Sequence, residues 1–445
     1  FMMAAGLSTL DIFFAQVYGD TDPGRNPDNG GRLMNAHFAT RSLDEKGTWK
    51  DLTRQKNSSA DISPTAGQMP RMLGLALASK VFRNSPGMQE LSKKFTLNGN
   101  EVTFGTIGDA STSEGHFFET INAAGVLQVP LALSVWDDGY GISVPRKLQT
   151  TNESISELLK GFVSGEKGRG IRLYTAHGWD YPALYDMYEE GIAVCREEHV
   201  PVVFHVTELT QPQGHSTSGS HERYKPAERL AWEKEHDCIP RMRQWILAEK
   251  LATAEELDAI EAEAVKTARS ARDRSWKAYI EPFLAEREHL VGVVRSTHCP
   301  CQKQDRIDKI VADLEALAEP TRKDIISSAK KIMRDVCTTC SMKKPMKADL
   351  EAWMAEQRKL NEARYSSHLY SQSDQGALKI EGIPPRFSEK SPIVTGREIL
   401  RTNYDILFRD NPLAMIFGED VGKIGGVNQT LEGLQAKYGE TRISD

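Results

Sequence analysis

Short apolar runs alternate with stretches of helical apolar spacing over the first half of the chain. The apolar runs have strand length and lie at 102–107 (VTFGTI), 131–136 (LALSVW) and 202–206 (VVFHV). Apolar residues recur with helical period at 68–82, 115–128 and 181–198. Because strands that are apolar throughout are buried on both faces, this alternation predicts an α/β fold with a parallel sheet flanked by helices.

The pattern changes twice further along the chain. Residues 241–363 are polar and rich in Glu, Lys, Ala and Arg, so we predict helices there, followed by a loop-like linker at 364–391. A second α/β pattern occupies 391–445, with a helix expected at 396–408. We therefore expect three parts, 1–240, 241–390 and 391–445. Residues 1–19 read as a helix that is already under way, so the chain is expected to be part of a longer protein.

Composition narrows the class of protein. The net charge of −6 argues against nucleic acid or an anionic membrane as the main partner, because such proteins usually carry a basic excess. No apolar run approaches the roughly 20 residues that span a bilayer, and no signal peptide is visible. Six cysteines in 445 residues are too few for a disulfide scaffold and favour a cytoplasmic location.

The segment 108–145 (GDASTSEGHFFETINAAGVLQVPLALSVWDDGYGISVP) holds the strongest chemical signal. Asp109 and Asp138 each follow a predicted strand, and parallel strands bring their carboxyl ends to one edge of the sheet. Two carboxylates and a backbone carbonyl suit Mg²⁺, which completes its shell with phosphate and water. The small residues Gly108, Ala110 and Ser111 allow close backbone approach, and the next helix offers free N–H groups to a diphosphate. The alternative is that both acids are ordinary turn and cap residues.

This segment resembles the thiamine diphosphate motif of the decarboxylating components of 2-oxo acid dehydrogenase complexes. The family has Gly-Asp/Glu-Gly, followed about thirty residues later by Asn-Asn-Gly-Tyr. The resemblance implies that Asp109 and Asp138 bind Mg²⁺ by side chain and Tyr140 by its carbonyl. This chain departs from the motif at Ala110 and at Asp137-Asp138, where the family has Gly and Asn-Asn.

Three further stretches resemble the same family in the same order. They are NGGRLMNAHF at 29–38, SPTAGQMP at 63–70 and the loop that contains GHSTS. The resemblance places Ser63 and Thr65 at the cofactor, with Thr65 under the thiazolium, and makes His215 the candidate catalytic residue. Trp136 stands at the cofactor in place of a polar residue common in the family.

The resemblance covers about residues 1–245, and the stretch 394–445 resembles the opening of the family's β-type subunit. The chain thus looks like an α–β fusion with a thiamine diphosphate-binding fold and the start of a pyrimidine-binding domain. The family's glutamate that contacts the aminopyrimidine belongs to the β-type subunit, and the resemblance places it beyond Asp445.

The implied function is thiamine diphosphate-dependent oxidative decarboxylation of a 2-oxo acid, of the branched-chain type such as 2-oxoisovalerate. The implied partner is the lipoyl-bearing acyltransferase, and family members suggest a dimer of fused chains. Two alternatives stay open. One is a pyruvate or acetoin dehydrogenase component, and the other is a non-catalytic scaffold that kept the fold.

The cysteine pairs of CPC and CTTC raise a second possible metal site. Four thiolates can hold zinc, but the gap between the two pairs is longer than usual, so isolated thiols are the favoured interpretation. The four residues are Cys299, Cys301, Cys337 and Cys340.

Overall fold

The computed structural model divides the chain into two compact units. It describes residues 2–60, 62–165, 168–215, 220–296, 303–337, 341, 343–367, 369–371, 373–374 and 376–445. The helical unit comprises Phe1–Trp49, Lys56–Asp61 and Glu255–Ile380. The sheet unit comprises Lys50–Gln55, Ile62–Ala254 and Glu381–Asp445.

A four-stranded parallel sheet forms the centre of the sheet unit. Its strands lie in the order β1, β2, β6, β5. Gly108 at the end of β1 pairs with Trp136 at the end of β2, which in turn pairs with Val206 of β6. The three strands therefore end side by side at one edge. Their bounds are β1 Thr103–Gly108, β2 Leu131–Trp136, β5 Arg172–His177 and β6 Val202–Thr207.

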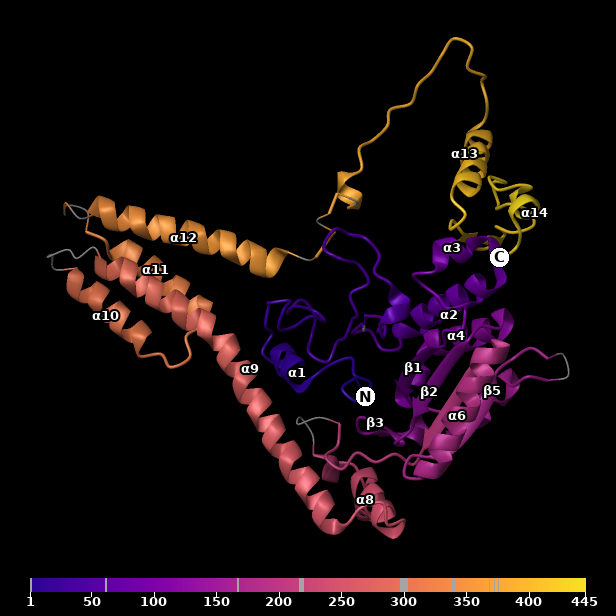
Figure 1. The fold of residues 1–445 in the computed structure, drawn as a ribbon, viewed down its shortest axis with the longest axis horizontal. Coiled ribbons are helices and arrows are strands. Elements are labelled where there is room, and N and C mark those ends of the chain that lie inside the picture. The colour runs from indigo at the N-terminus through magenta and orange to yellow at the C-terminus, as the bar shows by residue number, and fades with distance from the viewer. Residues whose placement is uncertain are drawn as a thin grey trace. The chain divides into compact units, whose positions relative to one another are not determined.

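Alternate residues of the central strands feed two separate cores. Leu131, Leu133 and Val135 pack against helices α2 (Gln68–Asn84) and α4 (Gly115–Leu127). Ala132 faces the opposite side and packs with Phe204 against α6 (Tyr181–Glu198). Because side chains alternate along a strand, this is the three-layer α/β arrangement predicted from the sequence. Figure 1 shows α6 on one face of the sheet and α2 with α4 on the other.

Short elements complete this part of the sheet unit. A two-stranded hairpin, β3 (Tyr140–Gly141) and β4 (Val144–Pro145), follows β2 and is antiparallel. The remaining helices are α3 Gln89–Ser92, α5 Ile155–Leu159, α7 Ala227–Glu235 and α8 Cys238–Ala248, with single 3-10 turns at Leu52–Arg54, Pro86–Met88, Ala110–Ser113, Arg146–Leu148, Thr151–Glu153, Lys160–Phe162 and His221–Arg223.

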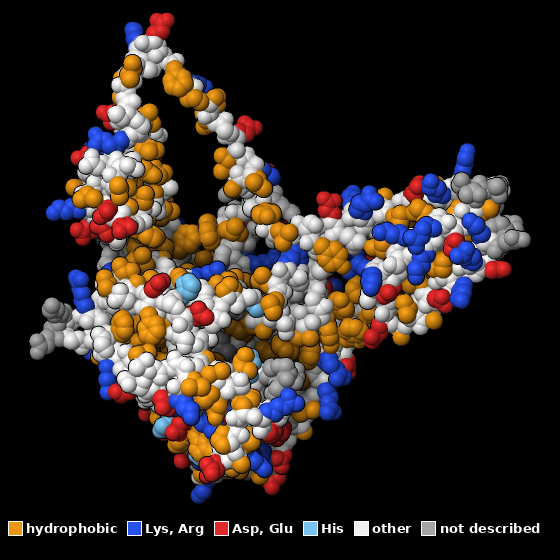
Figure 2. All heavy atoms as spheres, turned by 180° about the vertical axis from the view of Figure 1, so that it is seen from behind, with side chains coloured by type: hydrophobic (Ala, Val, Ile, Leu, Met, Phe, Trp, Pro, Cys, Tyr) orange, Lys and Arg blue, Asp and Glu red, His pale blue; other side chains and the backbone are white. Residues whose placement is uncertain are grey.

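Long helices dominate the helical unit. Helix α9 (Ala254–Ser296) packs against α10 (Gln304–Glu315), α11 (Arg322–Asp335) and α12 (Lys343–Ser366) around a core that includes Phe283, Leu290 and Trp353. A 3-10 turn, Ala377–Lys379, follows. These helices confirm the predicted helical segment. Their surfaces carry Lys, Arg, Asp and Glu side chains (Figure 2), which fits solvated helix faces.

The first residues depart from the predicted helix. Of residues 2–19, only α1 (Leu10–Val17) is helical, because Gly6 adopts a positive φ of 72° and Thr9 caps the helix at its start. The prediction that residues 1–19 form one helix is therefore wrong. Helix α1 is held within the helical unit by the Asp11 carboxylate, which pairs with Arg274 of α9 at 2.9 Å.

The C-terminal segment has its own small core. Helix α13 (Gly396–Asp410) begins with a capping box between Thr395 and Glu398. A short parallel pair, β7 (Ile416–Phe417) and β8 (Ile443–Ser444), and helix α14 (Leu434–Tyr438) pack with it around Phe408. The predicted α/β pattern of this segment is confirmed. Among all the helices that the structure describes, none is long and apolar enough to cross a bilayer.

Candidate functional site

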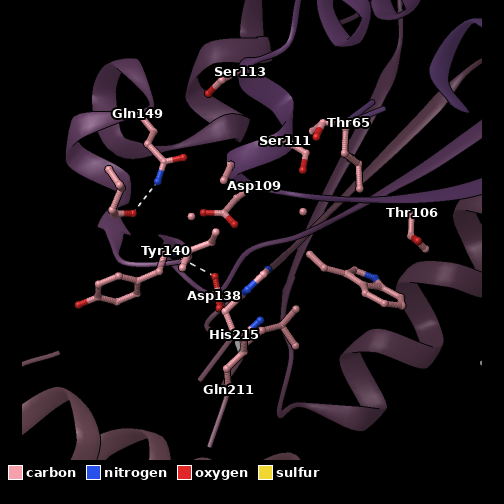
Figure 3. Close-up of a pocket in the computed structure, with 18 of the residues that line it drawn as sticks. Thr65, Thr106, Asp109, Ser111, Ser113, Asp138, Tyr140, Gln149, Gln211 and His215 are labelled. Carbon is pink, nitrogen blue, oxygen red and sulfur yellow. Dashed lines mark hydrogen bonds between the residues drawn. The ribbon is translucent and has the colours of Figure 1, made fainter. Parts of the chain in front are cut away.

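A cavity of about 1160 Å³ lies where β1, β2 and β6 end (Figure 3). Open α/β sheets bind ligands at this edge, because loops diverge there and leave a crevice. Both polar and apolar side chains line it. The lining residues are Thr65, Gln68, Thr106, Ile107, Gly108, Asp109, Ala110, Ser111, Ser113, Trp136, Asp138, Tyr140, Gly141, Ile142, Val144, Leu148, Gln149, Leu209, Thr210, Gln211 and His215.

The structure brings together nine of the ten site residues that the sequence suggested. Thr65 comes from before α2 and His215 from the loop after β6, and both line the same cavity as the 108–145 segment. Ser63 is not among the lining residues. The roles of all ten stay predictions. Of the zinc candidates, Cys299, Cys301 and Cys340 lie outside the described residues, so the structure does not address that site.

Asp109 and Asp138 form a buried acidic pair. Their residues are only 4% and 8% exposed, and the two labelled side chains point toward one another in Figure 3. Burial, followed by the charges of Asp137 and Asp138, raises the pKa of Asp109 to about 7. Burial also raises the pKa of Asp138, although the Tyr140 backbone N–H donates to its Oδ1 at 3.1 Å. Both carboxylates are costly to ionise in this environment without a cation.

The pair fits a hard divalent cation. A cation between the two carboxylates would offset both their burial and their mutual repulsion, and Tyr140 belongs to the turn that carries Asp138. No Lys or Arg occurs among the described residues that line the cavity. Within the described part of the chain, no group of three or more His, Cys, Asp or Glu side chains is placed to hold a metal. A site of two carboxylates and a carbonyl does not require such a group.

Asp137 belongs to a different network, which sequence reasoning missed. It is fully buried, and its Oδ2 accepts from Arg146 Nη1 at 2.8 Å and from His205 Nε2 at 2.9 Å. Burial opposes its ionisation, but the His205 hydrogen bond and the Arg146 charge outweigh this and lower the pKa of Asp137. The pKa values of the two neighbouring aspartates therefore shift in opposite directions: burial raises that of Asp138, whereas His205 and Arg146 lower that of Asp137.

A second buried ion pair supports the same turn from helix α7. Lys225 Nζ lies 2.7 Å from Glu233 Oε1, and both side chains are almost completely buried. Arg229 donates to Glu233 at 2.8 Å and, through Nη2, to the Asp138 carbonyl at 2.8 Å. Lys225 Nζ also lies 5.1 Å from the centre of the Tyr140 ring. The turn 138–140 is therefore held by its own backbone and by α7.

The alanine at position 110 is compatible with the local backbone. Ala110 starts a 3-10 turn and is not among the residues with positive φ, so a Cβ causes no backbone strain there. The Ala110 Cβ has room because residue 141 is a glycine and has no side chain. A Cβ at Gly141 would lie 2.7 Å from the Ala110 Cβ. Ala110 and Gly141 are complementary in size.

Divalent-cation binding is expected to strengthen as the pH rises to about 7. A cation must displace the proton that Asp109 holds below its pKa of about 7, so affinity should increase up to that pH and then level off. Mn²⁺ titration at a series of pH values measures this, and Glu119→Gln on the exposed face of α4 should reproduce the wild-type profile. A flat profile between about pH 5 and about pH 8 would contradict the assignment of Asp109.

Comparison with known proteins identifies the family. The model of the dehydrogenase E1 component family matches residues 1–282 of the 445. The chain is 26% identical to the mouse mitochondrial 2-oxoisovalerate dehydrogenase subunit alpha over 241 residues, which cover 54% of this chain and 45% of that protein. It is 28% identical to the Arabidopsis thaliana subunit alpha 1 over 241 residues, 54% of this chain and 42% of that one.

A pyruvate-type relative matches at a similar level. The Rickettsia typhi pyruvate dehydrogenase E1 component subunit alpha is 29% identical over 195 residues, which cover 44% of this chain and 52% of that protein. The chain thus spans about half the length of the curated relatives it matches. The family match covers more than half of the chain and includes the whole cavity wall. The resemblance predicted from the sequence is confirmed, and the chain belongs to the dehydrogenase E1 component family.

Proposed function

We propose that this chain forms part of a thiamine diphosphate-dependent E1 component that decarboxylates a 2-oxo acid of the branched-chain type. The observation that carries the proposal is the buried pair Asp109 and Asp138 at the ends of two adjacent parallel strands. The family match and the names of the relatives support the reaction class.

In this proposal the carboxylates of Asp109 and Asp138 and the carbonyl of Tyr140 hold Mg²⁺. The hydroxyl of Ser111 and the backbone at Gly108 and Ala110 face the same space and offer hydrogen-bond donors to a diphosphate. When bound, thiamine diphosphate supplies the nucleophilic carbon and the electron sink for loss of CO₂. The protein would orient the cofactor and exclude water.

Other lining residues have roles in the same proposal. Thr65 and Ser63 would contact the cofactor ring, although Ser63 is not part of the lining in this structure. Trp136 is 42% exposed at the cavity and would cover one side of the cofactor. His215, on the loop after β6, would hold or donate a proton during decarboxylation and acyl transfer, because an imidazole can both accept and donate a proton.

The cavity wall favours an apolar acyl chain. Ile142, Val144, Leu148 and Leu209 line it together. This supports the branched-chain type, whereas the similar match to a pyruvate dehydrogenase subunit supports the pyruvate type as the second candidate. Comparison of rates with 2-oxoisovalerate, pyruvate and acetoin distinguishes these substrates. We further propose a lipoyl-bearing acyltransferase as acyl acceptor, a dimer of fused chains, and a cytoplasmic location.

Thiamine diphosphate binding is expected to depend on Mg²⁺. Without the cation, the diphosphate would enter a cavity with two buried carboxylates and no Lys or Arg in its described lining, so calorimetry of the full-length protein should detect binding with Mg²⁺ and none in EDTA. Thiamine, which lacks the diphosphate, is the matched control and should show no Mg²⁺ dependence. Binding of equal strength with and without the cation would refute the proposal.

If the chain is a non-catalytic scaffold that kept the fold, a different decarboxylation rate is expected. Its decarboxylation rate with an artificial electron acceptor would equal the background and would not change in Asp109→Ala. A wild-type rate clearly above that of Asp109→Ala would exclude the scaffold.

A further inference from the structure

We infer that Asp137 is a positioning residue and that Arg146 and His205 hold it so that the adjacent turn presents its oxygens to the metal. This inference rests on the proposed metal site. Three aspartates, at 109, 137 and 138, lie close together at the strand ends, and only Asp109 and Asp138 are proposed as metal ligands. The contacts of Asp137 separate it from the other two.

Protein donors already occupy both oxygens of Asp137. Oδ1 accepts from the backbone N–H of Gly139 at 2.9 Å. Oδ2 accepts from Arg146 Nη1 at 2.8 Å and from His205 Nε2 at 2.9 Å. The residue is fully buried and is not among those that line the cavity. A carboxylate with three donors and no exposure to the cavity is a poor candidate for a ligand and a good anchor.

The same residue is fixed through its main chain. Its N–H donates to the Val206 carbonyl at 2.9 Å, and its carbonyl accepts from the Leu209 N–H at 3.0 Å. These bonds extend the pairing of β2 with β6 by one step. Asp137 is therefore the last residue that the sheet holds, and Asp138 is the first residue of the turn.

Arg146 closes the turn from its other end. Its backbone N–H donates to the Gly139 carbonyl at 2.9 Å, while its side chain reaches Asp137. The turn between them contains Asp138 and Tyr140 and has Gly139 at a positive φ of 82°, a conformation that suits glycine. Asp137 and Arg146 thus form a clasp around the segment with the proposed ligands.

His205 links the clasp to helix α5 on the same face of the sheet. It is 1% exposed, and its Nδ1 lies 2.5 Å from Ser156 Oγ at the start of α5. The imidazole therefore has a partner on each nitrogen, which fixes its orientation. Groups that orient metal ligands from outside the coordination shell typically change metal affinity by about 10–100-fold when they are removed. The network of Asp137, Arg146 and His205 has this position relative to Asp138 and Tyr140.

Mn²⁺ binding to the full chain, followed by electron paramagnetic resonance, tests the inference. Asp137→Asn places an amide N–H₂ against the Arg146 guanidinium, so two donors oppose each other, and Mn²⁺ affinity should fall at least about tenfold. Arg146→Gln should weaken affinity by a similar factor. Because Gln can accept from the new amide, the double variant Asp137→Asn/Arg146→Gln should return to within about threefold of wild type. Lys160→Gln, which breaks only the exposed pair with Glu157, is the matched control.

Each outcome bears on a different claim. Failure of the wild type to bind Mn²⁺ would refute the proposed metal site. Normal Mn²⁺ affinity in folded Asp137→Asn, with or without a lower melting temperature, would refute the positioning role. A loss that the double variant does not restore, with a Mn²⁺ spectrum that differs from wild type, would make Asp137 a ligand instead. If Asp137→Asn does not fold, the Mn²⁺ affinities of Arg146→Lys and Arg146→Gln are compared instead. Only Lys keeps the positive charge beside Asp137, so Arg146→Lys should retain most of the affinity, and equal losses in both variants would refute the positioning role.

Discussion

Asp109→Asn is expected to abolish divalent-cation binding and, at the same time, to stabilise the metal-free protein at about pH 8. The affinity loss should exceed the roughly 100-fold that removal of an outer partner can cause, because a donor itself is lost. The stability gain follows from the pKa of Asp109, which burial and the charges of Asp137 and Asp138 raise to about 7. Ionised Asp109 is therefore unfavourable in the folded protein.

The sign of this effect depends on the direction of the shift. A carboxyl whose pKa is higher in the folded than in the unfolded state stabilises the fold below the unfolded value of 3.8, and this contribution is lost as the pH rises through about 7. Above that pH, Asn avoids the buried charge, and we expect a gain on the order of 2 kcal/mol. Urea unfolding in EDTA at about pH 5 and about pH 8 measures it, since the difference between wild type and variant should be small at the lower pH.

Saturating Mg²⁺ should reverse the order of stability. The cation binds only the wild type, so wild type should become the more stable protein as Mg²⁺ is added. Glu119→Gln, an exposed acid on α4, serves as control and should follow wild type under all conditions. If Asp109→Asn is less stable than wild type in EDTA at about pH 8, ionised Asp109 does not destabilise the metal-free fold, and the prediction is wrong.

Lys225→Met is expected to cost about 3–5 kcal/mol of unfolding free energy, the largest destabilisation that we predict for a single substitution. Lys225 and Glu233 have side chains only 1% and 2% exposed and lie 2.7 Å apart. Without Lys225, Glu233 still pairs with Arg229 but loses its more buried partner. The negative charge of Glu233 then stays inside the protein without full compensation.

The exposed pair of Lys93 and Glu90 supplies the matched control. Its side chains are 67% and 90% exposed, so Lys93→Met should change the free energy of unfolding by less than about 1 kcal/mol. The double variant Lys225→Met/Glu233→Met removes both buried charges and should recover part of the loss. Urea unfolding of the three variants measures this, and equal effects of Lys225→Met and Lys93→Met would contradict the importance of burial.

The central strands β2 and β6 were predictable because nearly all of their residues are buried, and the edge strand β1 was visible as an apolar run. Strands β1, β2 and β6 agree with the sequence to within one residue at either end. Strand β5 (Arg172–His177) was missed, since it mixes Arg, Thr and His with its apolar residues and so lacks a continuous apolar run.

Some residues of the site were also predictable from the sequence, whereas others were identified only by their tertiary contacts. Asp109 and Asp138 were predictable because strand ends with acidic turns are visible in sequence and parallel strands share an edge. Arg146 and His205 gave no signal. Arg146 follows a proline at the start of a short 3-10 turn, and His205 is one polar residue within an apolar strand. Their importance comes from contacts with Asp137 that no sequence period encodes.

By itself, the sequence determined the α/β class, the order of the main helices and strands, the family and the two carboxylates at the strand ends. Periodicity and turn residues act over a few positions, so a single chain displays them directly. The tertiary structure alone showed that Asp137, the neighbour of Asp138, is tied to Arg146 and His205. Burial and partner charges set the state of a carboxyl group, and these depend on residues that only folding brings together.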